Sequence, residues 1–248
     1  MTTTVHVIAN AHLDPVWLWP WQEGVDNLLA TCRSACDRLD AHGDLIFTQG
    51  EAWAYDQIER IDPVLFGRIR EHIDAGRWAI VGGWWIQPDC NLPSGFALAR
   101  QIELGKAYFL DRFGWFPRTG YNIDSFGHAA SLPDIMAAAG QDRYVMMRPG
   151  DHELGLPGRV FRWRGRADGA VVTVFRIAGG YATMGKITRG HVEASLRGLP
   201  EGVEHTMCFI GVGDHGGGPS ESQVQWVRDH AEAFHGARLV FSSVDRMP

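Results

Sequence analysis

The sequence has no long apolar run and no excess of positive charge, and each absence argues against a class of partner. No hydrophobic stretch approaches the roughly 20 residues that a membrane-spanning helix needs, and no signal peptide opens the chain. We therefore expect no membrane partner and a cytoplasmic location. With 23 basic and 29 acidic residues the net charge is −6, which gives no support for binding to nucleic acid.

Cysteine pairs and nucleotide-binding motifs are missing as well. The four cysteines form no CxxC pair, and Cys32 and Cys36 lie one helical turn apart, so we interpret all four as reduced and mostly buried. There is no GxGxxG motif, and no Lys-Ser/Thr follows the glycine run 216–218, which argues against a phosphate-binding loop. Since no repeat, low-complexity tract or linker interrupts the chain, we predict a single domain over residues 1–248.

Strands and helices alternate along the chain. Short β-branched apolar runs predict strands at residues 5–11, 44–48, 78–81, 119–123, 143–147, 160–164, 171–177, 206–212 and 238–241. Apolar residues at helical spacing predict helices at 23–41, 51–74, 94–113, 131–139, 191–199 and 222–234, with Ser94 as an N-cap and Gly114 as a stop. Residues 167–169 are expected to form a hairpin turn. Repeated β–α units predict an α/β fold, and about seven parallel strands in one domain favour a β/α barrel over an open sheet.

Carboxylates and imidazoles follow several of these strands. In a parallel sheet or barrel, functional groups gather where the strands end. The residues in question are His12 and Asp14 after the first strand, Asp89 after the third, Asp124 and His128 after the strand 119–123, and Asp214 and His215 after the strand 206–212. Mixed nitrogen and oxygen ligands suit a metal ion of borderline hardness, with zinc as the first hypothesis.

Each of these residues also has a simpler interpretation. His12 or Asp14 could cap the helix that follows, and Asp124 could be an N-cap or turn residue. We interpret His128 as hydrogen-bonded to a loop backbone. The tryptophans are either core residues or aromatic faces that stack on sugar rings; they include Trp17, Trp19, Trp21, Trp84 and Trp85.

Five segments occur in an order typical of one enzyme family and cover most of the chain. They are ANAHLDPVWLW, GGWWIQPDCNLPSG, RQIELGKAYFLDRFG, IDSFGHAASLPDIMAAAG and GVGDHGGGP. Together they resemble the N-terminal catalytic domain of glycoside hydrolase family 38, the α-mannosidases. The resemblance implies a seven-stranded parallel β/α barrel, related in fold to certain polysaccharide deacetylases, that holds one zinc ion.

The resemblance also implies residue roles. A zinc-dependent retaining α-mannosidase would hydrolyse terminal α-mannosides, with a mannose-containing oligosaccharide or glycoside as its ligand. His12 and Asp14 match zinc ligands, Asp124 matches a residue that is both zinc ligand and catalytic nucleophile, and Asp214 is the candidate acid/base residue. The predicted substrate-binding residues are Trp17, Trp85, Asp89, Arg100, Tyr181 and His215.

Departures from the family pattern leave alternatives open. The family's fourth zinc ligand is a histidine in a later region, and family members are several times longer than 248 residues. We therefore expect a truncated form, a subunit that needs a partner, or a homo-oligomer. Phe96 stands where the family usually has glutamate, in a loop near the site. The rival functions are a metal-dependent carbohydrate deacetylase and an inactive truncated barrel that only binds metal.

Overall fold

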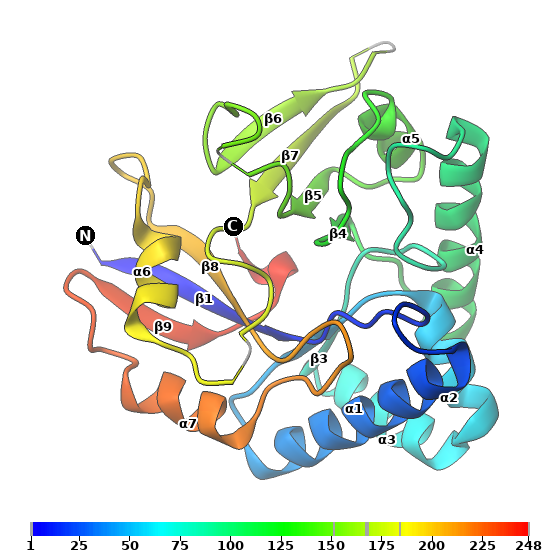
Figure 1. Cartoon of the computed structure of the whole chain (residues 1–248), viewed down its shortest axis with the longest axis horizontal. Coiled ribbons are helices and arrows are strands. Elements are labelled where there is room, and N and C mark those ends of the chain that lie inside the picture. Colours follow the sequence, from blue (N-terminus) through cyan, green and yellow to red (C-terminus); the bar gives the residue numbers. More distant parts are fainter. Residues whose placement is uncertain (1, 151, 167–168, 184, 248) are drawn as a thin grey trace. The chain divides into compact units, whose positions relative to one another are not determined.

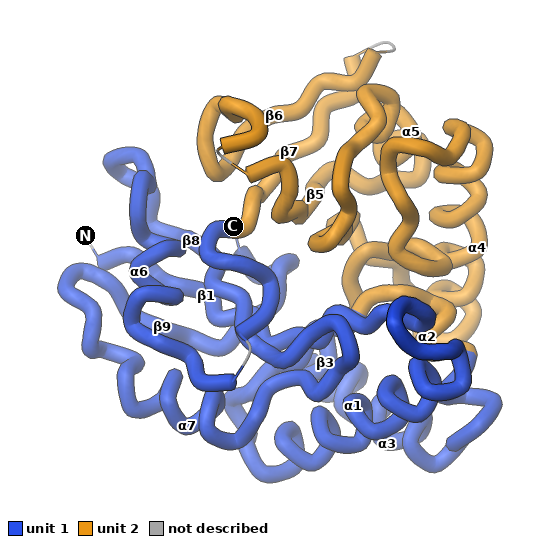
Figure 2. The backbone as a smooth tube through the Cα atoms, in the orientation of Figure 1, with its two compact units in different colours: residues 1–49, 57–79, 178–248 blue, residues 50–56, 80–177 orange. Residues whose placement is uncertain are grey.

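The computed structural model describes residues 2–150, 152–166, 169–183 and 185–247. The chain forms two compact units that alternate along the sequence (Figures 1 and 2). Unit 1 contains residues 1–49, 57–79 and 178–248, and unit 2 contains residues 50–56 and 80–177. The single domain over 1–248 stays a prediction.

Unit 1 is built around the strand β1 (Thr3–Asn10). Val5, Val7 and Ile8 in this strand have no exposed surface, because a parallel strand is covered on both of its faces. β1 pairs in parallel with β2 (Phe47–Gln49), β8 (His205–Ile210) and β9 (Ala237–Phe241), and β3 (Trp78–Ile80) follows β2 in the sheet. Helix α1 (Trp21–Ala41) packs against α3 (Pro63–Asp74). Helix α6 (Arg189–Leu196) packs against β8, and α7 (Glu221–Asp229) packs against β9. A short 3-10 helix, Val244–Arg246, follows β9.

The predicted helix 51–74 is in fact two helices, α2 (Ala52–Ile61) and α3 (Pro63–Asp74). Pro63 has no backbone N–H and its ring disfavours helical geometry at the preceding residue, so the helix ends before it. Asp62 then serves as the N-cap of α3, where its Oδ1 accepts a hydrogen bond from the Leu65 N–H at 3.0 Å. Apolar spacing continues across the break, which is why spacing alone predicts one helix.

Unit 2 contains a four-stranded sheet in the order β4-β5-β7-β6. The strands β4 (Thr119–Asn122), β5 (Arg143–Met146) and β7 (Val171–Arg176) are parallel, while β6 (Val160–Arg164) runs antiparallel to β7. The antiparallel β6–β7 pair confirms the predicted hairpin. Of its predicted turn, residues 167 and 168 lie outside the described residues.

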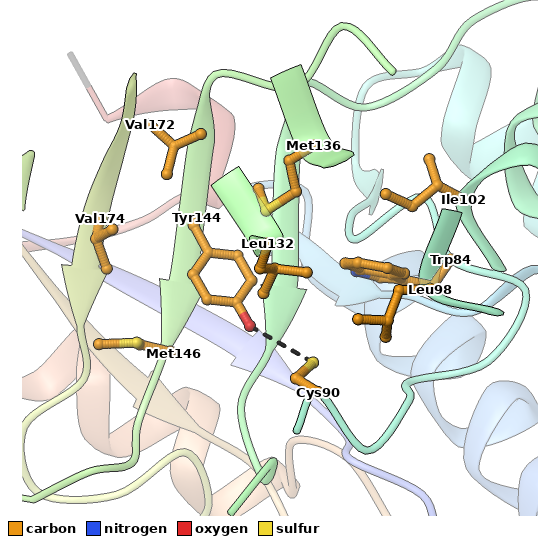
Figure 3. Close-up of a cluster of buried hydrophobic side chains, with 10 residues drawn as sticks. All are labelled: Trp84, Cys90, Leu98, Ile102, Leu132, Met136, Tyr144, Met146, Val172 and Val174. Atoms are coloured by element: carbon orange, nitrogen blue, oxygen red, sulfur yellow. Dashed lines mark hydrogen bonds between the residues drawn. The ribbon is translucent and has the colours of Figure 1, made fainter. Parts of the chain in front are cut away.

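The helix α4 (Gly95–Phe113) begins and ends as the sequence predicts. Ser94 Oγ accepts a hydrogen bond from the Ala97 N–H at 3.3 Å, and Gly114 closes the helix with a φ of 74°. Helix α5 (Leu132–Ala138) packs against α4 and β7. Figure 3 shows the core of this unit, where buried side chains gather around Tyr144 and Trp84.

The α/β class with parallel strands is confirmed, but the seven-stranded barrel is not. Strand pairings within the described residues form one five-stranded and one four-stranded sheet, and neither sheet is closed. All four cysteines are free and buried, as predicted. None of the helices in the described ranges combines the length and the apolar character that a bilayer crossing requires.

Candidate active site

Asn10, the last residue of β1, links the end of this strand to two neighbouring segments of unit 1. Its side-chain amide donates to the carbonyl oxygens of Tyr181 at 2.9 Å and of Ile210 at 3.1 Å. Asn10 is buried, and an apolar side chain here would leave both carbonyl groups without these partners. The ends of β1 and β8 and the segment around Tyr181 are therefore held together.

His12 and Asp14 lie beside each other directly after β1. His12 Nε2 is 3.4 Å from Asp14 Oδ1; the histidine is buried, while the carboxyl group is 29% exposed. The Asp14 backbone N–H donates to the carbonyl oxygen of Asp214 at 2.9 Å. The ring of Tyr181 meets the His12 ring edge-on at 5.2 Å between centroids. The structure thus brings together four of the predicted site residues within unit 1.

Asp214 is held in an unusual backbone conformation. Its φ is 59°, in the left-handed region that non-glycine residues rarely adopt and that is often found at functional sites. The hydroxyl group of Tyr181 donates to Asp214 Oδ1 at 2.8 Å. Since Tyr181 is itself buried, this hydrogen bond gives the carboxyl group a defined orientation.

His215 contacts the first turns of α1. Its Nε2 lies 2.9 Å from both Glu23 Oε1 and Asn27 Nδ2, and its ring lies 4.3 Å from that of Trp19. The hydrogen bonds to Glu23 and Asn27 hold the loop after β8 against α1. Trp17 is 59% exposed, so its ring offers an apolar face of the kind that stacks on sugars.

Asp124 is paired with an arginine in unit 2. Asp124 follows β4 and Arg148 follows the adjacent parallel strand β5, and their side chains form an ion pair. The guanidinium group of Arg148 also lies over the Phe126 ring at 4.3 Å from the centroid. Sequence reasoning missed Arg148, although the strand-end rule that selected Asp124 would find it if arginine were included.

A chain of buried hydrogen bonds supports the backbone of Arg148. Asn122 Nδ2 donates to the Tyr144 hydroxyl oxygen at 3.0 Å, and this hydroxyl group donates to His128 Nδ1, 2.9 Å away, because the other ring nitrogen faces a carbonyl oxygen, which can only accept. His128 Nε2 then carries the ring proton and donates to the carbonyl oxygen of Arg148 at 2.9 Å. Burial lowers the pKa of His128, which agrees with a neutral ring. The prediction that His128 hydrogen-bonds a loop backbone is confirmed.

The remaining predicted substrate-binding residues of unit 2 have structural partners. Asp89 Oδ1 accepts from two backbone N–H groups of the following turn at 2.8 and 3.0 Å. Arg100 lies on the exposed side of α4, where its Nη1 is 2.6 Å from Glu103 Oε1. Trp85 is half-buried. These contacts explain the local structure, and a substrate-binding role for the three residues stays a prediction.

His12 and Asp14 fit two neighbouring positions of a zinc shell. Two ligand atoms about 2.0–2.1 Å from zinc at a tetrahedral angle are about 3.4 Å apart, which is the distance between His12 Nε2 and Asp14 Oδ1. Within the part of the chain that the structure describes, no group of three or more histidine, cysteine, aspartate or glutamate residues could hold a metal ion. Asp124 as a third ligand stays a prediction.

Comparison with known proteins gives the chain a family. Its residues 2–246 match the model of the Glycosyl hydrolases family 38 N-terminal domain. Alpha-mannosidase 2C1 from Mus musculus is 29% identical over 222 residues, which cover 89% of this chain and 21% of that protein. An alpha-mannosidase from Saccharomyces cerevisiae is 28% identical over 232 residues, covering 91% of this chain and again 21% of the relative. The chain thus spans about a fifth of the length of these curated relatives.

A solved structure shares the fold. The crystal structure of an alpha-mannosidase from Enterococcus faecalis V583 superposes with a TM-score of 0.85 at 18% sequence identity, over 98% of this chain and 28% of that chain. This likeness concerns the fold, whereas the family model covers nearly the whole sequence. The chain therefore belongs to glycosyl hydrolase family 38, whose N-terminal domain it matches.

Proposed function

We propose that this chain is the catalytic domain of a zinc-dependent retaining α-mannosidase that hydrolyses terminal α-mannosides. The observation that carries the proposal is the buried His12 beside Asp14, with ligand atoms 3.4 Å apart and with Asp214 bonded to the same segment. The names of the curated relatives, which are alpha-mannosidases, support mannose as the sugar.

His12 and Asp14 would hold the metal ion, together with Asp124. Bound zinc would act as a Lewis acid that holds two hydroxyl groups of the sugar. The His12 ring is buried against Tyr181, so Nε2 would be oriented before the metal arrives. The exposed ring of Trp17 would stack on the apolar face of the sugar.

Asp124 would be the nucleophile and Asp214 the acid and then the base. The Asp124 carboxylate attacks the anomeric carbon while the bond to the leaving oxygen breaks and that oxygen takes the proton of Asp214. In the second step Asp214 removes a proton from water, which attacks the anomeric carbon and releases Asp124. A retaining mechanism of this kind requires the two carboxyl groups to be about 5–5.5 Å apart.

Neighbouring side chains would keep both carboxyl groups in position. Tyr181 donates to Asp214 Oδ1, and Arg148 pairs with Asp124. The proposal includes the seven-stranded β/α barrel that the family resemblance implies, because a barrel collects groups at the ends of its strands.

Metal analysis and covalent labelling test the proposal. We expect one zinc ion per chain, lost in Asp14→Asn and kept in Asp111→Asn, which removes an exposed acid on α4. A 5-fluoro-α-mannosyl fluoride should label Asp124 when the chain, or a longer form that contains it, turns over an aryl α-mannoside. Zinc without labelling, together with acetate release from an acetylated sugar, would instead favour the deacetylase.

A further inference from the structure

A cavity of about 410 Å³ lies within unit 2. Its walls include three aromatic rings and several aliphatic side chains, among them Phe126, Phe161, Trp163, Met146, Leu154 and Leu156. Protein interiors contain few voids larger than a water molecule, and an apolar cavity of about 150 Å³ is already large enough for benzene. The cavity in unit 2 therefore has room for a fused aromatic ring system.

The cavity offers few hydrogen-bonding partners to water or to a polar ligand. Among the described residues that line it, His128 is the titratable side chain, and both of its ring nitrogens are engaged. Nδ1 accepts from Tyr144 and Nε2 donates to the carbonyl oxygen of Arg148. A buried water molecule needs two to four polar partners, so water in this cavity is poorly bonded. An apolar group that displaces such water gains affinity.

The aromatic wall of the cavity is fixed before any ligand arrives. The Trp163 ring meets the His128 ring edge-on at 6.3 Å between centroids and lies 6.1 Å from the Tyr144 ring. Tyr144 is buried, and its hydroxyl group is hydrogen-bonded to Asn122 and His128. A ligand that packs against this wall therefore has little ordering of side chains to induce, which favours binding.

The rim of the cavity is open to solvent and is not cationic. Phe126 is 81% exposed and Leu154 is 54% exposed, so part of the lining lies at the surface of unit 2. The guanidinium group of Arg148 covers the Phe126 ring at 4.3 Å from its centroid, but its charge is paired with Asp124. The lining therefore favours an uncharged ligand over an anion.

We propose that this cavity is a binding site for a flat, uncharged aromatic molecule the size of two fused rings. The faces of such a molecule pack against the aromatic side chains of the wall, in the offset or edge-on arrangements that aromatic rings prefer. Binding here needs neither a metal ion nor a sugar, and no covalent bond forms or breaks. The inference goes beyond the proposed function and does not depend on it.

Calorimetric titration of the chain at neutral pH with 2-naphthol, phenol and 2-naphthoate tests the inference. None of the three probes contains a glycosidic bond, so a mannosidase would not consume them. We expect 2-naphthol to bind at least about tenfold more tightly than phenol, because the second ring buries further apolar surface. We expect 2-naphthoate to bind at least about tenfold more weakly than 2-naphthol, because its carboxylate loses hydration beside an apolar lining.

NMR and three variants locate the bound probe. The indole N–H resonance of Trp163, assigned from its loss in Trp163→Leu, should shift when 2-naphthol is added. Trp163→Leu should weaken 2-naphthol binding by about tenfold. Phe126 and Phe96 are both 81% exposed, but only Phe126 is among the lining residues. Phe126→Ala should therefore weaken binding by at least about threefold, while Phe96→Ala should leave it unchanged.

The contrary results are specific. Absence of 2-naphthol binding, or equal affinity for phenol and 2-naphthol, would overturn the site. A 2-naphthoate affinity equal to that of 2-naphthol would overturn the preference for an uncharged ligand. If 2-naphthol binds without shifting the Trp163 resonance and as tightly to Phe126→Ala as to the parent, it binds outside this cavity and the proposal is wrong. The proposed function is tested separately, by zinc content and by labelling of Asp124.

Discussion

Gly105 and Gly67 give opposite expectations for the same substitution. Both lie inside helices, Gly105 in α4 and Gly67 in α3. Alanine in place of glycine in a helix interior is worth roughly 0.5–1 kcal/mol, because it restricts the unfolded chain and favours the helix. Nothing lies within 4 Å of a Cβ added at Gly67, so Gly67→Ala should raise the free energy of unfolding by about that amount.

At Gly105 the same methyl group would collide with backbone. The added Cβ would be 2.3 Å from the Gly83 carbonyl oxygen and 2.5 Å from the Trp84 carbonyl carbon. Backbone atoms cannot rotate aside as a flexible side chain can, and Trp84 is buried in the packed core of unit 2 (Figure 3). Overpacking of this kind costs roughly 1–3 kcal/mol. After the helix gain is subtracted, Gly105→Ala should lower the free energy of unfolding by roughly 0.5–2 kcal/mol.

Urea titration followed by circular dichroism and tryptophan fluorescence measures both changes as shifts of the midpoint at constant slope. If the two units unfold in separate transitions, each variant should move the transition of its own unit, unit 1 for Gly67 and unit 2 for Gly105. A Gly105→Ala chain as stable as the parent would refute the close packing of α4 on the backbone of Gly83 and Trp84.

Three further predictions follow from single contacts. Burial, with His205 nearby, lowers the pKa of His6 to about 4. The unfolded chain therefore binds a proton at this histidine more readily than the folded chain does. When the pH is lowered from 6.5 to 4, the free energy of unfolding should fall by up to about 3 kcal/mol. His6→Gln should make the melting temperature depend less on pH over this range. A melting temperature that depends on pH as it does in the parent would contradict the prediction for His6. Asp62→Ala removes the N-cap of α3 and should cost about 0.5–2 kcal/mol in urea titrations, whereas Asp62→Asn should retain most of the stability. Tyr144→Phe removes the hydroxyl group that donates to His128 and should cost about 1–3 kcal/mol. Nitrogen NMR should then show a shifted Nδ1 resonance, while Nε2 keeps its proton because the Arg148 carbonyl oxygen still accepts it. An unaltered Nδ1 resonance would argue against the hydrogen-bond chain.

Local patterns in the sequence predict much of this fold. β-branched runs identify β1 and its neighbours because the buried strands of a parallel sheet are apolar on both faces. Ser94 and Gly114 mark the ends of α4 because capping depends on one side chain and one backbone conformation. The break at Pro63 is also local, but the apolar spacing that runs through it favours a single helix, so the proline has to be given more weight than the spacing.

Contacts between distant residues are what local patterns do not predict. His215 lies next to Asp214 in the sequence, yet its partners are Glu23 and Asn27 in α1, which lie 192 and 188 positions earlier. The partner of Asp124 is Arg148, which lies beyond the next strand. Spacing identifies which residues follow strands, whereas side-chain partners depend on the pairing of those strands and on loop conformation.

The proposed roles divide between the two units, and this division makes them separately testable. Unit 1 holds the His12–Asp14 pair and Asp214, and unit 2 holds Asp124 with its partner Arg148. Loss of zinc in Asp14→Asn tests the contribution of unit 1 without requiring any reaction, whereas a covalent label on Asp124 tests that of unit 2. A chain, or a longer form that contains it, that binds zinc through His12 and Asp14 and turns over an aryl α-mannoside without a label on Asp124 would support the metal ligands of unit 1 and count against Asp124 as the nucleophile, so the two assignments can fail independently.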